Sequence, residues 1–532
     1  MIDVVVVGSG PGGVNAAAAL AEAGRRVLML DYGNEDRRYA PLIPRRDFTE
    51  LRHTDPQQHR YFLGDHFEGI PFGPVRVGAQ LTPPRMHILA DAPVCQPIDA
   101  PGFAASSSLA RGGLGAGWSA GVFPFTDDEL ADMGLRVADL QPHYDAAAAR
   151  IGVAGEHDDL APFFPESPAI MPALALDSNA ELVVARYQRK RDVLNRQGFF
   201  LGRTRLAVCT RAHRGRGPYD YLDLDYWTDI DRSVYRPQWT LEELERLPNF
   251  TYLPRRLVHE FVELGDRVQV RAGHADGGGE ECHETRALVL AAGTFGTARI
   301  VLRSLGRYGT PVPLLCNAYT YVPTVNLGML GHPARDRRAS LAQLTAMVRL
   351  DDSGRLLQAQ LFSYRSLLTF KLMKEVPLAC RQSRRLLRLL MPSFAILGIH
   401  HEDRPSPRKT VALRCGEPDV LQVCYQPSSE EERRQRADER VLLRFFRRHL
   451  GCWPLKAIRP GHGSSIHYGG TFPITPDGNE PLTCDRESRL RGTRAVYLAD
   501  GSVFPRLPAK GLTFNIMANA DRVGTLLART LR

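Results

Sequence analysis

The chain has 532 residues, of which 43% are hydrophobic and 24% are charged, and its formal net charge is +9 at pH 7. This length predicts two or three domains with room for a sizeable core, and the ordinary composition argues against long disordered tails. The modest positive charge does not indicate a nucleic-acid-binding protein, since most basic residues are expected on solvated helix faces.

Cysteine usage and the apolar segments predict a cytoplasmic protein. The nine cysteines form no CxxC pair and no regular framework, which favours reduced thiols over disulfides or a zinc site. The apolar N-terminus lacks a basic n-region and has four glycines between positions 8 and 13, which is typical of a core strand rather than an export signal. No later apolar run approaches the ~18 residues of a membrane span.

The first 31 residues have the pattern of a dinucleotide-binding βαβ unit. The apolar run Val4–Val7 precedes glycines in GxGxxG spacing, an alanine-rich helical segment follows, and a second apolar strand ends at Asp31. Gly8 permits the tight turn, Gly10 lets the backbone approach a pyrophosphate, and Gly13 lets helix and strand pack closely. The helix N-terminus supplies amide donors to the diphosphate, and Asp31 can accept hydrogen bonds from ribose hydroxyls.

A second glycine-rich segment follows residues 32–101, for which we predict only irregular structure. Leu109–Phe125 contains five glycines within ten residues around Trp118 and ends in an apolar VFPF. Such a density is needed where backbone must lie against a flat or phosphorylated ligand. An ordinary glycine-rich surface loop is the alternative.

The middle of the chain is predicted to return to the N-terminal sheet. Residues 127–152 have a helical pattern, and three short antiparallel strands are expected between Phe250 and Ala272. The apolar strand Ala287–Ala292, then Gly293 and a helix that begins near Thr297 repeat the strand, glycine and helix order of the N-terminus. We therefore expect this segment to join the same sheet as the first strand.

Residues 311–460 are predicted to form a separate, substrate-facing region. Segment 367–399 interleaves basic residues with Leu, Met and Phe, which is typical of a basic amphipathic helix pair that covers a sheet. A weak contact of residues 370–397 with a membrane surface is the alternative. The polar run 400–403 predicts no metal site, because adjacent side chains on an extended segment point to opposite faces. Ser428–Leu450 is predicted to be a helix with a serine cap, an acidic first turn and a basic last turn.

The C-terminal segment carries the motifs with the most specific chemistry. It runs GHGSSIHYGGTFPI from Gly461 to Ile474, and after an apolar strand it continues DGSVFP from Asp500 and then LTFNIMANA. Together with the N-terminal βαβ unit, the loop 111–121 and AAGTFGTARIVLRS from Ala291, these motifs resemble the glucose-methanol-choline (GMC) family of flavoprotein oxidoreductases. The glycine-rich loop also resembles that of the pyranose oxidases.

The resemblance implies an α/β fold in which a Rossmann-like FAD-binding domain is interleaved with an α+β substrate domain built on an antiparallel sheet. It assigns residues 1–135, 248–310 and 461–532 to the discontinuous FAD-binding domain. Residues 136–247 and 311–460 are assigned to the substrate-binding domain.

The resemblance also implies which residues bind FAD. Thr513 would begin the last helix, whose backbone amides would face the pyrimidine edge of the flavin, where the reduced ring carries negative charge. In pyranose oxidases a histidine just before the tryptophan binds the flavin covalently, and Gly117 stands there in this chain, so FAD is expected to be non-covalent. The residues implied for FAD are Gly8, Gly10, Gly13, Asp31, Arg111, Gly112, Gly113, Gly117, Trp118, Ser119, Val258, Gly293, Asp500, Gly501, Gly511, Leu512 and Thr513.

The catalytic residues implied by the family are matched only in part. His467 matches the histidine that takes the hydroxyl proton while a hydride leaves the substrate carbon for flavin N5, a task for which imidazole has a suitable pKa. The second catalytic position is normally His or Asn, but here it is Gly511, which offers no side chain to hold the alcohol oxygen. Lys510, Asn515 and Tyr468 are the candidates to replace it.

The expected function is FAD-dependent oxidation of a CH–OH group in a sugar, polyol or secondary-metabolite alcohol, with oxygen or another carrier as electron acceptor. Gly511 leaves open an FAD-dependent C–C desaturation or a redox-neutral rearrangement. The basic segment leaves open a membrane-surface flavoprotein with structural FAD, and NAD in place of FAD is a weaker alternative. The expected partners are a small-molecule substrate and the electron acceptor, without nucleic acid or metal.

Overall fold

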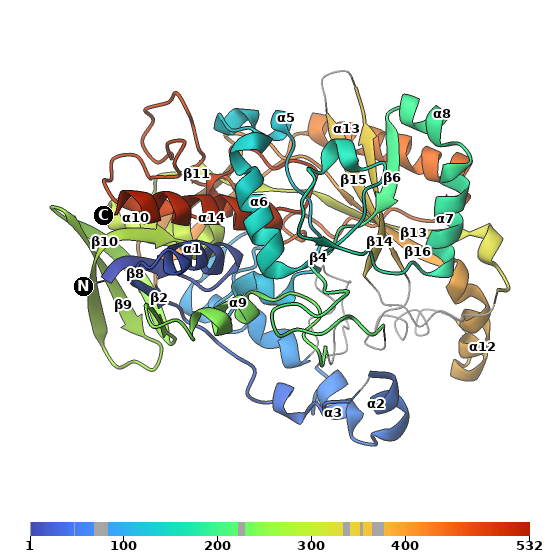
Figure 1. The fold of residues 1–532 in the computed structure, drawn as a ribbon, viewed down its shortest axis with the longest axis horizontal. Helices are drawn as coiled ribbons and strands as arrows, with labels where there is room; N and C mark the ends of the chain where they lie inside the picture. The colour runs from blue at the N-terminus through green and yellow to red at the C-terminus, as the bar shows by residue number, and fades with distance from the viewer. Residues whose placement is uncertain are drawn as a thin grey trace.

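A computed structural model describes residues 2–46, 48–68, 83–221, 229–332, 341–351, 355–363 and 377–531. These residues form two large sheets, one mostly parallel and one antiparallel, which occupy opposite halves of the molecule, with helices packed on both (Figure 1). The predicted α/β class is therefore confirmed. The assignment of residue ranges to two domains stays a prediction.

The mostly parallel sheet contains the predicted N-terminal βαβ unit. Its strand order is β7-β2-β1-β10-β9-β8, with β21 paired to β10. The strands are β1 (Ile2–Val7), β2 (Val27–Leu30), β7 (Phe250–Leu253), β8 (Arg256–Leu264), β9 (Arg267–His274), β10 (Glu280–Leu290) and β21 (Val496–Leu498). The return of the chain to this sheet is confirmed, because Val4 to Val7 pair in parallel with Ala287 to Leu290.

One expectation about this sheet is wrong. Phe250–Leu253 was expected to be antiparallel, but β7 pairs in parallel with β2, from Val27 opposite Phe250 to Leu30 opposite Leu253. A period of two identifies a strand without its direction, and the chain enters β7 from the same side of the sheet as β2. Strands β8 and β9 are antiparallel, as expected.

Helices bury both faces of the parallel strands, which explains their continuous apolar runs. On one face, α1 (Pro11–Glu22) and the final helix α14 (Thr513–Thr530) lie side by side (Figure 1) and pack on Val4 and Val6. On the other face, α10 (Gly293–Ser304) packs against Val5 and Val7.

The antiparallel sheet has the order β19-β13-β16-β15-β14-β6. Its strands are β6 (Phe199–Arg203), β13 (Tyr319–Asn326), β14 (Ala342–Arg349), β15 (Leu356–Ser363), β16 (Phe394–His400) and β19 (Cys452–Pro454). Helices α7 (Ser178–Gln188) and α13 (Ser429–Phe445) pack on one face of this sheet. The predicted helix at 428–450 is confirmed, with Ser428 as its N-cap and a turn of π-helix at its end.

The predicted amphipathic helix pair is wrong in its second half. Helix α12 (Cys380–Leu390) forms, but Phe394–His400 is strand β16, in the interior of the antiparallel sheet. The apolar run after Pro392 is therefore buried between two strands rather than on a second helix. The first part of the segment, residues 364–376, lies outside the described residues.

Smaller elements connect these layers. The remaining strands are β3 (Ile98–Asp99), β4 (Val153–Ala154), β5 (Ile170–Met171), β11 (Val312–Pro313), β12 (Leu315–Cys316), β17 (Lys409–Arg414), β18 (Val420–Tyr425) and β20 (Tyr468–Gly469). The remaining α-helices are α2 (Phe48–Thr54), α3 (Gln58–Leu63), α4 (Ala92–Cys95), α5 (Asp127–Leu130), α6 (Val137–Ile151), α8 (Arg191–Arg196) and α9 (Pro237–Leu244). Among the helices described here, none combines the length and the apolar character needed to cross a bilayer.

Candidate cofactor and catalytic site

The turn between β1 and α1 follows a backbone path that requires glycine. Gly8 has φ +96°, and a Cβ there would lie 2.6 Å from the carbonyl oxygen of Ala291 on the neighbouring strand. A Cβ on Gly13 would lie 1.8 Å from the carbonyl oxygen of Gly8, so helix and strand can pack this closely only without a side chain. At Gly10 the nearest atom to a Cβ would be 3.9 Å away, which leaves open space beside the backbone.

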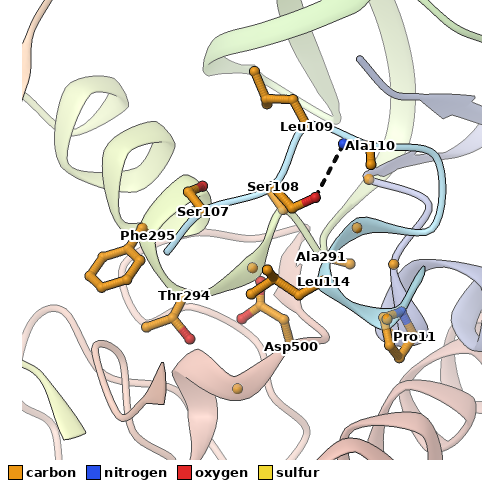
Figure 2. Close-up of a pocket in the computed structure, with 18 of the residues that line it drawn as sticks. Pro11, Ser107, Ser108, Leu109, Ala110, Leu114, Ala291, Thr294, Phe295 and Asp500 are labelled. Atoms are coloured by element: carbon orange, nitrogen blue, oxygen red, sulfur yellow. Dashed lines mark hydrogen bonds between the residues drawn. The ribbon is translucent and has the colours of Figure 1, made fainter. Parts of the chain in front are cut away.

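That open space belongs to a large cavity of about 1700 Å³, part of it open to solvent. Its wall is assembled from segments far apart in the chain, including the loop Ser106–Ala110, the start of α10 and Asp500 before α14 (Figure 2). Most residues that were expected to bind FAD line it, namely Gly8, Gly10, Asp31, Gly113, Gly117, Trp118, Ser119, Val258, Gly293, Asp500, Gly501, Leu512 and Thr513.

Three helices begin at this wall. Pro11 of α1, Gly293 of α10 and Thr513 of α14 all line the cavity. None of these three described helices has a side-chain cap or an acidic residue in its first turn. The first amides and the positive dipole ends of α1 and α14 are therefore available to an anionic ligand, whereas the N–H of Gly293 in α10 already hydrogen-bonds to the Asp500 carboxylate.

The cavity wall also contains a carboxylate held in place by two hydroxyl groups. Ser9 and Tyr252 both donate hydrogen bonds to Oδ2 of Asp31, at 2.5 and 2.9 Å. Burial raises the pKa of Asp31 to about 6, although these donors oppose the shift. Neither Ser9 nor Tyr252 was predicted as a site residue, and the only sequence signal is the position of Ser9 inside the glycine motif.

Asp500 is held in a similar way near the middle of the wall. Its carboxylate accepts hydrogen bonds from the hydroxyl groups of Ser502 and Thr297, both at 2.5 Å. Burial raises the pKa of Asp500. The hydrogen bond with Thr297 connects the C-terminal segment that begins at Asp500 to helix α10.

His467 lines the same cavity immediately before strand β20. Its Nδ1 atom is buried and has no hydrogen-bond partner among the described residues. Burial lowers the pKa of His467 to about 4. The imidazole is therefore neutral at pH 7 and can accept a proton.

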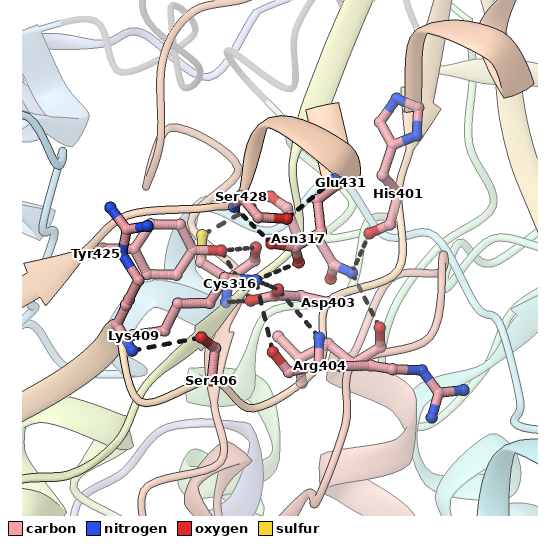
Figure 3. Close-up of polar contacts among 12 residues, drawn as sticks. Cys316, Asn317, His401, Asp403, Arg404, Ser406, Lys409, Tyr425, Ser428 and Glu431 are labelled. Carbon is pink, nitrogen blue, oxygen red and sulfur yellow. Dashed lines mark hydrogen bonds and ion pairs between the residues drawn. The ribbon is translucent and has the colours of Figure 1, made fainter. Parts of the chain in front are cut away.

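A buried ionic cluster anchors the loop that carries His467 (Figure 3). Lys409 donates to Asp403 and to Glu431, both at 2.5 Å, and the two acids more than offset the effect of burial, so that the pKa of Lys409 is raised. Asp403 also accepts the backbone N–H of Cys316 at 2.7 Å. Because Cys316 pairs with Tyr468 in the β12–β20 ladder, the cluster fixes the strand next to His467.

Comparisons with known proteins agree with this arrangement. Residues 426–520 match the family profile described as GMC oxidoreductase, and residues 3–39 match the profile described as FAD binding domain. The chain is an FAD-dependent oxidoreductase whose C-terminal part is similar to the GMC oxidoreductases. No curated protein sequence matches it.

A solved structure has the same fold over nearly the whole length. The crystal structure of pyridoxine 4-oxidase from Mesorbium loti covers 99% of this chain, and the match covers 99% of that chain, with a TM-score of 0.59 and 15% sequence identity. At this identity the likeness concerns the fold. Within this structure, the open space at Gly10 and the uncapped starts of α1 and α14 fit FAD.

Four residues predicted to bind FAD do not line the cavity. Gly13 serves the packing of α1. Arg111 forms ion pairs with Glu245 at 2.7 Å and Glu35 at 3.4 Å. Gly112 donates its N–H to the hydroxyl of Ser9 at 2.9 Å, and this hydrogen bond stabilises the turn between β1 and α1. The fourth is Gly511.

Gly511 faces an aromatic side chain rather than open space. A Cβ at this position would lie 3.2 Å from Cδ2 of Phe123, which is itself buried. The space into which a second catalytic side chain of the GMC motif would extend is therefore partly filled by Phe123.

Two of the proposed substitutes for that side chain are directed elsewhere. Lys510 is fully buried and donates to Glu129 at 2.7 Å, and Asn515 accepts from the Tyr144 hydroxyl at 2.6 Å while it donates to the carbonyl of Phe123 at 2.9 Å. Neither residue lines the cavity. Their polar groups stabilise the fold, so the expectation that they replace a catalytic side chain is not supported.

Tyr468 lines the cavity, but its hydroxyl is already engaged. It donates to the carbonyl oxygens of Ala104 and Gly463 at 2.6 and 2.8 Å and accepts from the N–H of Ser106 at 3.0 Å.

The side chains of the polar run 400–403 point in different directions, as the alternation of an extended segment predicts. The His400 ring lies against His467, His401 is 3.2 Å from Glu439, and Asp403 binds Lys409.

Proposed function

We propose that this enzyme oxidises a CH–OH group of a small alcohol, with His467 as the base that takes the hydroxyl proton. The observation that carries the proposal is the buried, neutral imidazole of His467 with an unpartnered Nδ1 on the wall of the FAD cavity. Imidazole in this state can remove a hydroxyl proton without first losing one of its own. A sugar, a polyol and a secondary-metabolite alcohol all fit this chemistry.

The chain's own residues would bind the cofactor and orient the reaction. The amides of α1 and the backbone at Gly10 would face the diphosphate, and Asp31 would accept from the ribose. The start of α14 would place positive potential near the ring system. Bound FAD would accept the hydride released from the alcohol carbon.

The test measures flavin reduction by alcohols in the absence of oxygen. The purified protein is expected to be yellow, and a suitable alcohol should bleach the flavin absorbance. His467→Ala should keep its FAD and lower the rate of flavin reduction by about 10²–10⁴-fold, the usual contribution of a positioned base. His462→Asn is the matched control, because His462 does not line the cavity.

Two results would overturn the proposal. One is a colourless protein that takes up no FAD. The other is a His467→Ala variant that reduces its flavin as fast as the unmodified enzyme. Turnover without consumption of any electron acceptor would instead favour the redox-neutral chemistry that Gly511 leaves open.

We also infer that the FAD is non-covalent. Gly117 lines the cavity beside Trp118 and has no side chain that could form a bond to the flavin. Acid precipitation of the yellow protein should therefore leave the flavin in the supernatant. Flavin that stays with the precipitate would contradict the inference.

The surface of α12 supports a second, peripheral interaction. Arg381, Arg384, Arg385 and Arg388 are exposed on this helix together with Leu386 and Leu389, which is typical of a helix that lies on an anionic bilayer. We propose a weak contact with anionic membranes, tested by sedimentation with phosphatidylserine vesicles. A variant with all four arginines changed to glutamine should lose the binding, and equal binding of both proteins would refute it.

A further inference from the structure

The antiparallel sheet has two faces of opposite character. On β15 and β16, Leu357, Ala359, Leu397 and Ile399 belong to the apolar core beneath α7 and α13. The alternate residues on these strands point to the other face, because side chains alternate across a strand. That second face is polar around His400 and Gly398, with apolar residues such as Phe362 and Ile396 nearer the other end of β16.

The polar face is organised in rows across neighbouring strands. His400 pairs in register with Tyr319 of β13 and with Gln358 of β15. The next row contains Tyr321, Gly398 and Gln360. A Cβ on Gly398 would lie 1.9 Å from the Tyr319 hydroxyl, so glycine there lets Tyr319 lie across the sheet.

The row at His400 contains buried polar groups without partners. Gln358 is fully buried, yet neither its amide oxygen nor its amide nitrogen has a hydrogen-bond partner in the part of the chain that the structure describes. His400 is 6% exposed, and its Nδ1 atom likewise has no partner there. Such groups are rare in folded proteins and indicate a missing ligand or water.

This row reaches the catalytic histidine. The rings of His400 and His467 are stacked, with centroids 5.1 Å apart and planes inclined by 18°. Tyr319 contacts His400 with its centroid 4.5 Å away. The sheet therefore packs a second imidazole against His467, although His400 and Gln358 are not themselves among the residues that line the FAD cavity. The position at Gly511 is partly closed by Phe123.

We propose that His400 is the second imidazole of this active site and that, with the amide of Gln358, it binds the substrate beside His467. The assignment rests on the proposed alcohol oxidation. His467 would take the proton of the substrate hydroxyl, and an N–H donor from His400 or Gln358 would hold the oxygen as it becomes a carbonyl. Bound FAD would supply the acceptor for the hydride from the alcohol carbon. The alcohol would thus lose a hydride, which carries both electrons, and a proton by separate routes.

The same face indicates the substrate class. The two rows at His400 and Gly398 contain histidine, glutamine and tyrosine side chains but no Lys, Arg, Asp or Glu. An amide both donates and accepts, and tyrosine rings stack on flat apolar faces. We therefore assign a neutral substrate with more than one hydrogen-bonding group, such as a polyol or a sugar.

The test compares variants at position 400 in the FAD-loaded enzyme. His400→Phe keeps a ring against His467 but loses its nitrogens, and it should slow anaerobic flavin reduction by about 100-fold or more, within the range for a group that acts on a reacting hydroxyl. His400→Asn keeps a hydrogen-bonding side chain and should retain most of the rate. Gln358→Leu should raise KM more than it lowers kcat, and His462→Asn should match the unmodified enzyme.

The substrates tested are sorbitol, glycerol and glucose, with gluconate and glucose 6-phosphate as charged counterparts. A neutral compound should bleach the flavin and its charged counterpart should not. His400→Phe that reduces its flavin at the original rate would overturn the role of His400. If that variant loses its FAD, His400→Leu and His400→Asn decide the question, since equal rates in these two would also overturn it.

The outcomes separate this proposal from the proposed function. Bleaching by a charged alcohol, or by a monofunctional alcohol alone, would overturn the substrate class while His467 kept its role. An unchanged rate in His467→Ala would overturn the alcohol oxidation itself.

Discussion

The wall of the FAD cavity and the polar face of the antiparallel sheet present different chemical groups to a ligand. The wall around Gly8, Gly10 and the starts of α1, α10 and α14 presents mainly backbone, and its two carboxylates, Asp31 and Asp500, are already held by hydroxyl groups. The sheet face presents side chains, and Gln358 has no partner among the described residues. A backbone site suits a ligand that is the same in every relative, whereas a side-chain site suits a substrate particular to one enzyme.

The two regions should therefore fail in different ways when they are changed. Damage to the wall should remove the fold or the cofactor. Damage to the sheet face should leave a yellow protein that reacts slowly. Substitutions in each region test this difference.

Gly13→Ala should have the largest effect. Its Cβ would lie 1.8 Å from the carbonyl oxygen of Gly8, so α1 cannot keep its position against β1. We expect little soluble, folded protein, measured by yield and by circular dichroism.

Gly10→Ala is the matched control for that variant. Gly10 has φ −65° and a Cβ there meets no atom closer than 3.9 Å, so the protein should fold. The methyl group would occupy the space of the diphosphate, and the affinity for FAD should fall by about tenfold or more, equivalent to ~1.4 kcal/mol. A folded Gly13→Ala protein with normal FAD content would contradict the packing argument.

Lys510→Met should destabilise the fold without changing the chemistry. Lys510 is fully buried against Glu129, and removal of one partner of such a pair costs about 3–5 kcal/mol. The free energy of unfolding should fall accordingly, while the rate of flavin reduction per bound FAD stays unchanged. The double variant Lys510→Met/Glu129→Gln should recover part of the loss. A specific loss of rate at unchanged stability would return Lys510 to the catalytic candidates.

The two regions should also titrate at different pH. Asp31 on the wall has a pKa of about 6, so FAD binding to the apoprotein should weaken as pH falls through 6 and the carboxylate becomes protonated. His467 has a pKa of about 4, so flavin reduction should be flat from pH 8 to 5 and then fall by about tenfold per pH unit below 4.

The same shift of His467 predicts the sign of an effect on stability. Between pH 6.5 and 4 the unfolded chain binds a proton at this histidine that the folded chain does not bind, so the free energy of unfolding should decrease as pH falls through this window. Asp31→Asn separates the two titrations, because it should remove the pH dependence of FAD binding and leave that of flavin reduction. A rate that titrates near the ordinary pKa of histidine would contradict the neutral, buried base.

The difference between a backbone site and a side-chain site also explains how much could be predicted from the sequence. Gly8, Gly13 and the start of α14 follow local rules of spacing and helix entry, and the structure places them as expected. His400 and Gln358 come from strands 42 residues apart in number, and only the register of β15 with β16 brings them together. No local pattern contains that register.

The errors have the same origin. Lys510 and Asn515 were selected because they flank Gly511 in sequence, but their side chains turn to Glu129 and Tyr144. The direction in which each side chain points at the start of α14 depends on tertiary packing. Residues close to Gly511 in sequence therefore need not point into the cavity. The strand β16 was taken for a helix because a short apolar run fits either structure.

Ser428→Ala tests the smallest effect, on a feature that is fully local. Ser428 and Glu431 form a reciprocal capping box, in which the serine hydroxyl accepts the N–H of Glu431 at 3.1 Å and the Glu431 carboxylate accepts the N–H of Ser428 at 2.8 Å. Loss of such a cap costs ~1 kcal/mol. Because Glu431 also binds Lys409, whose partner Asp403 anchors the strand beside His467, a larger loss accompanied by slower flavin reduction would show that the ionic cluster transmits the change to the catalytic loop. A loss confined to thermal stability, with kcat and KM unchanged, would show that the cap supports α13 alone.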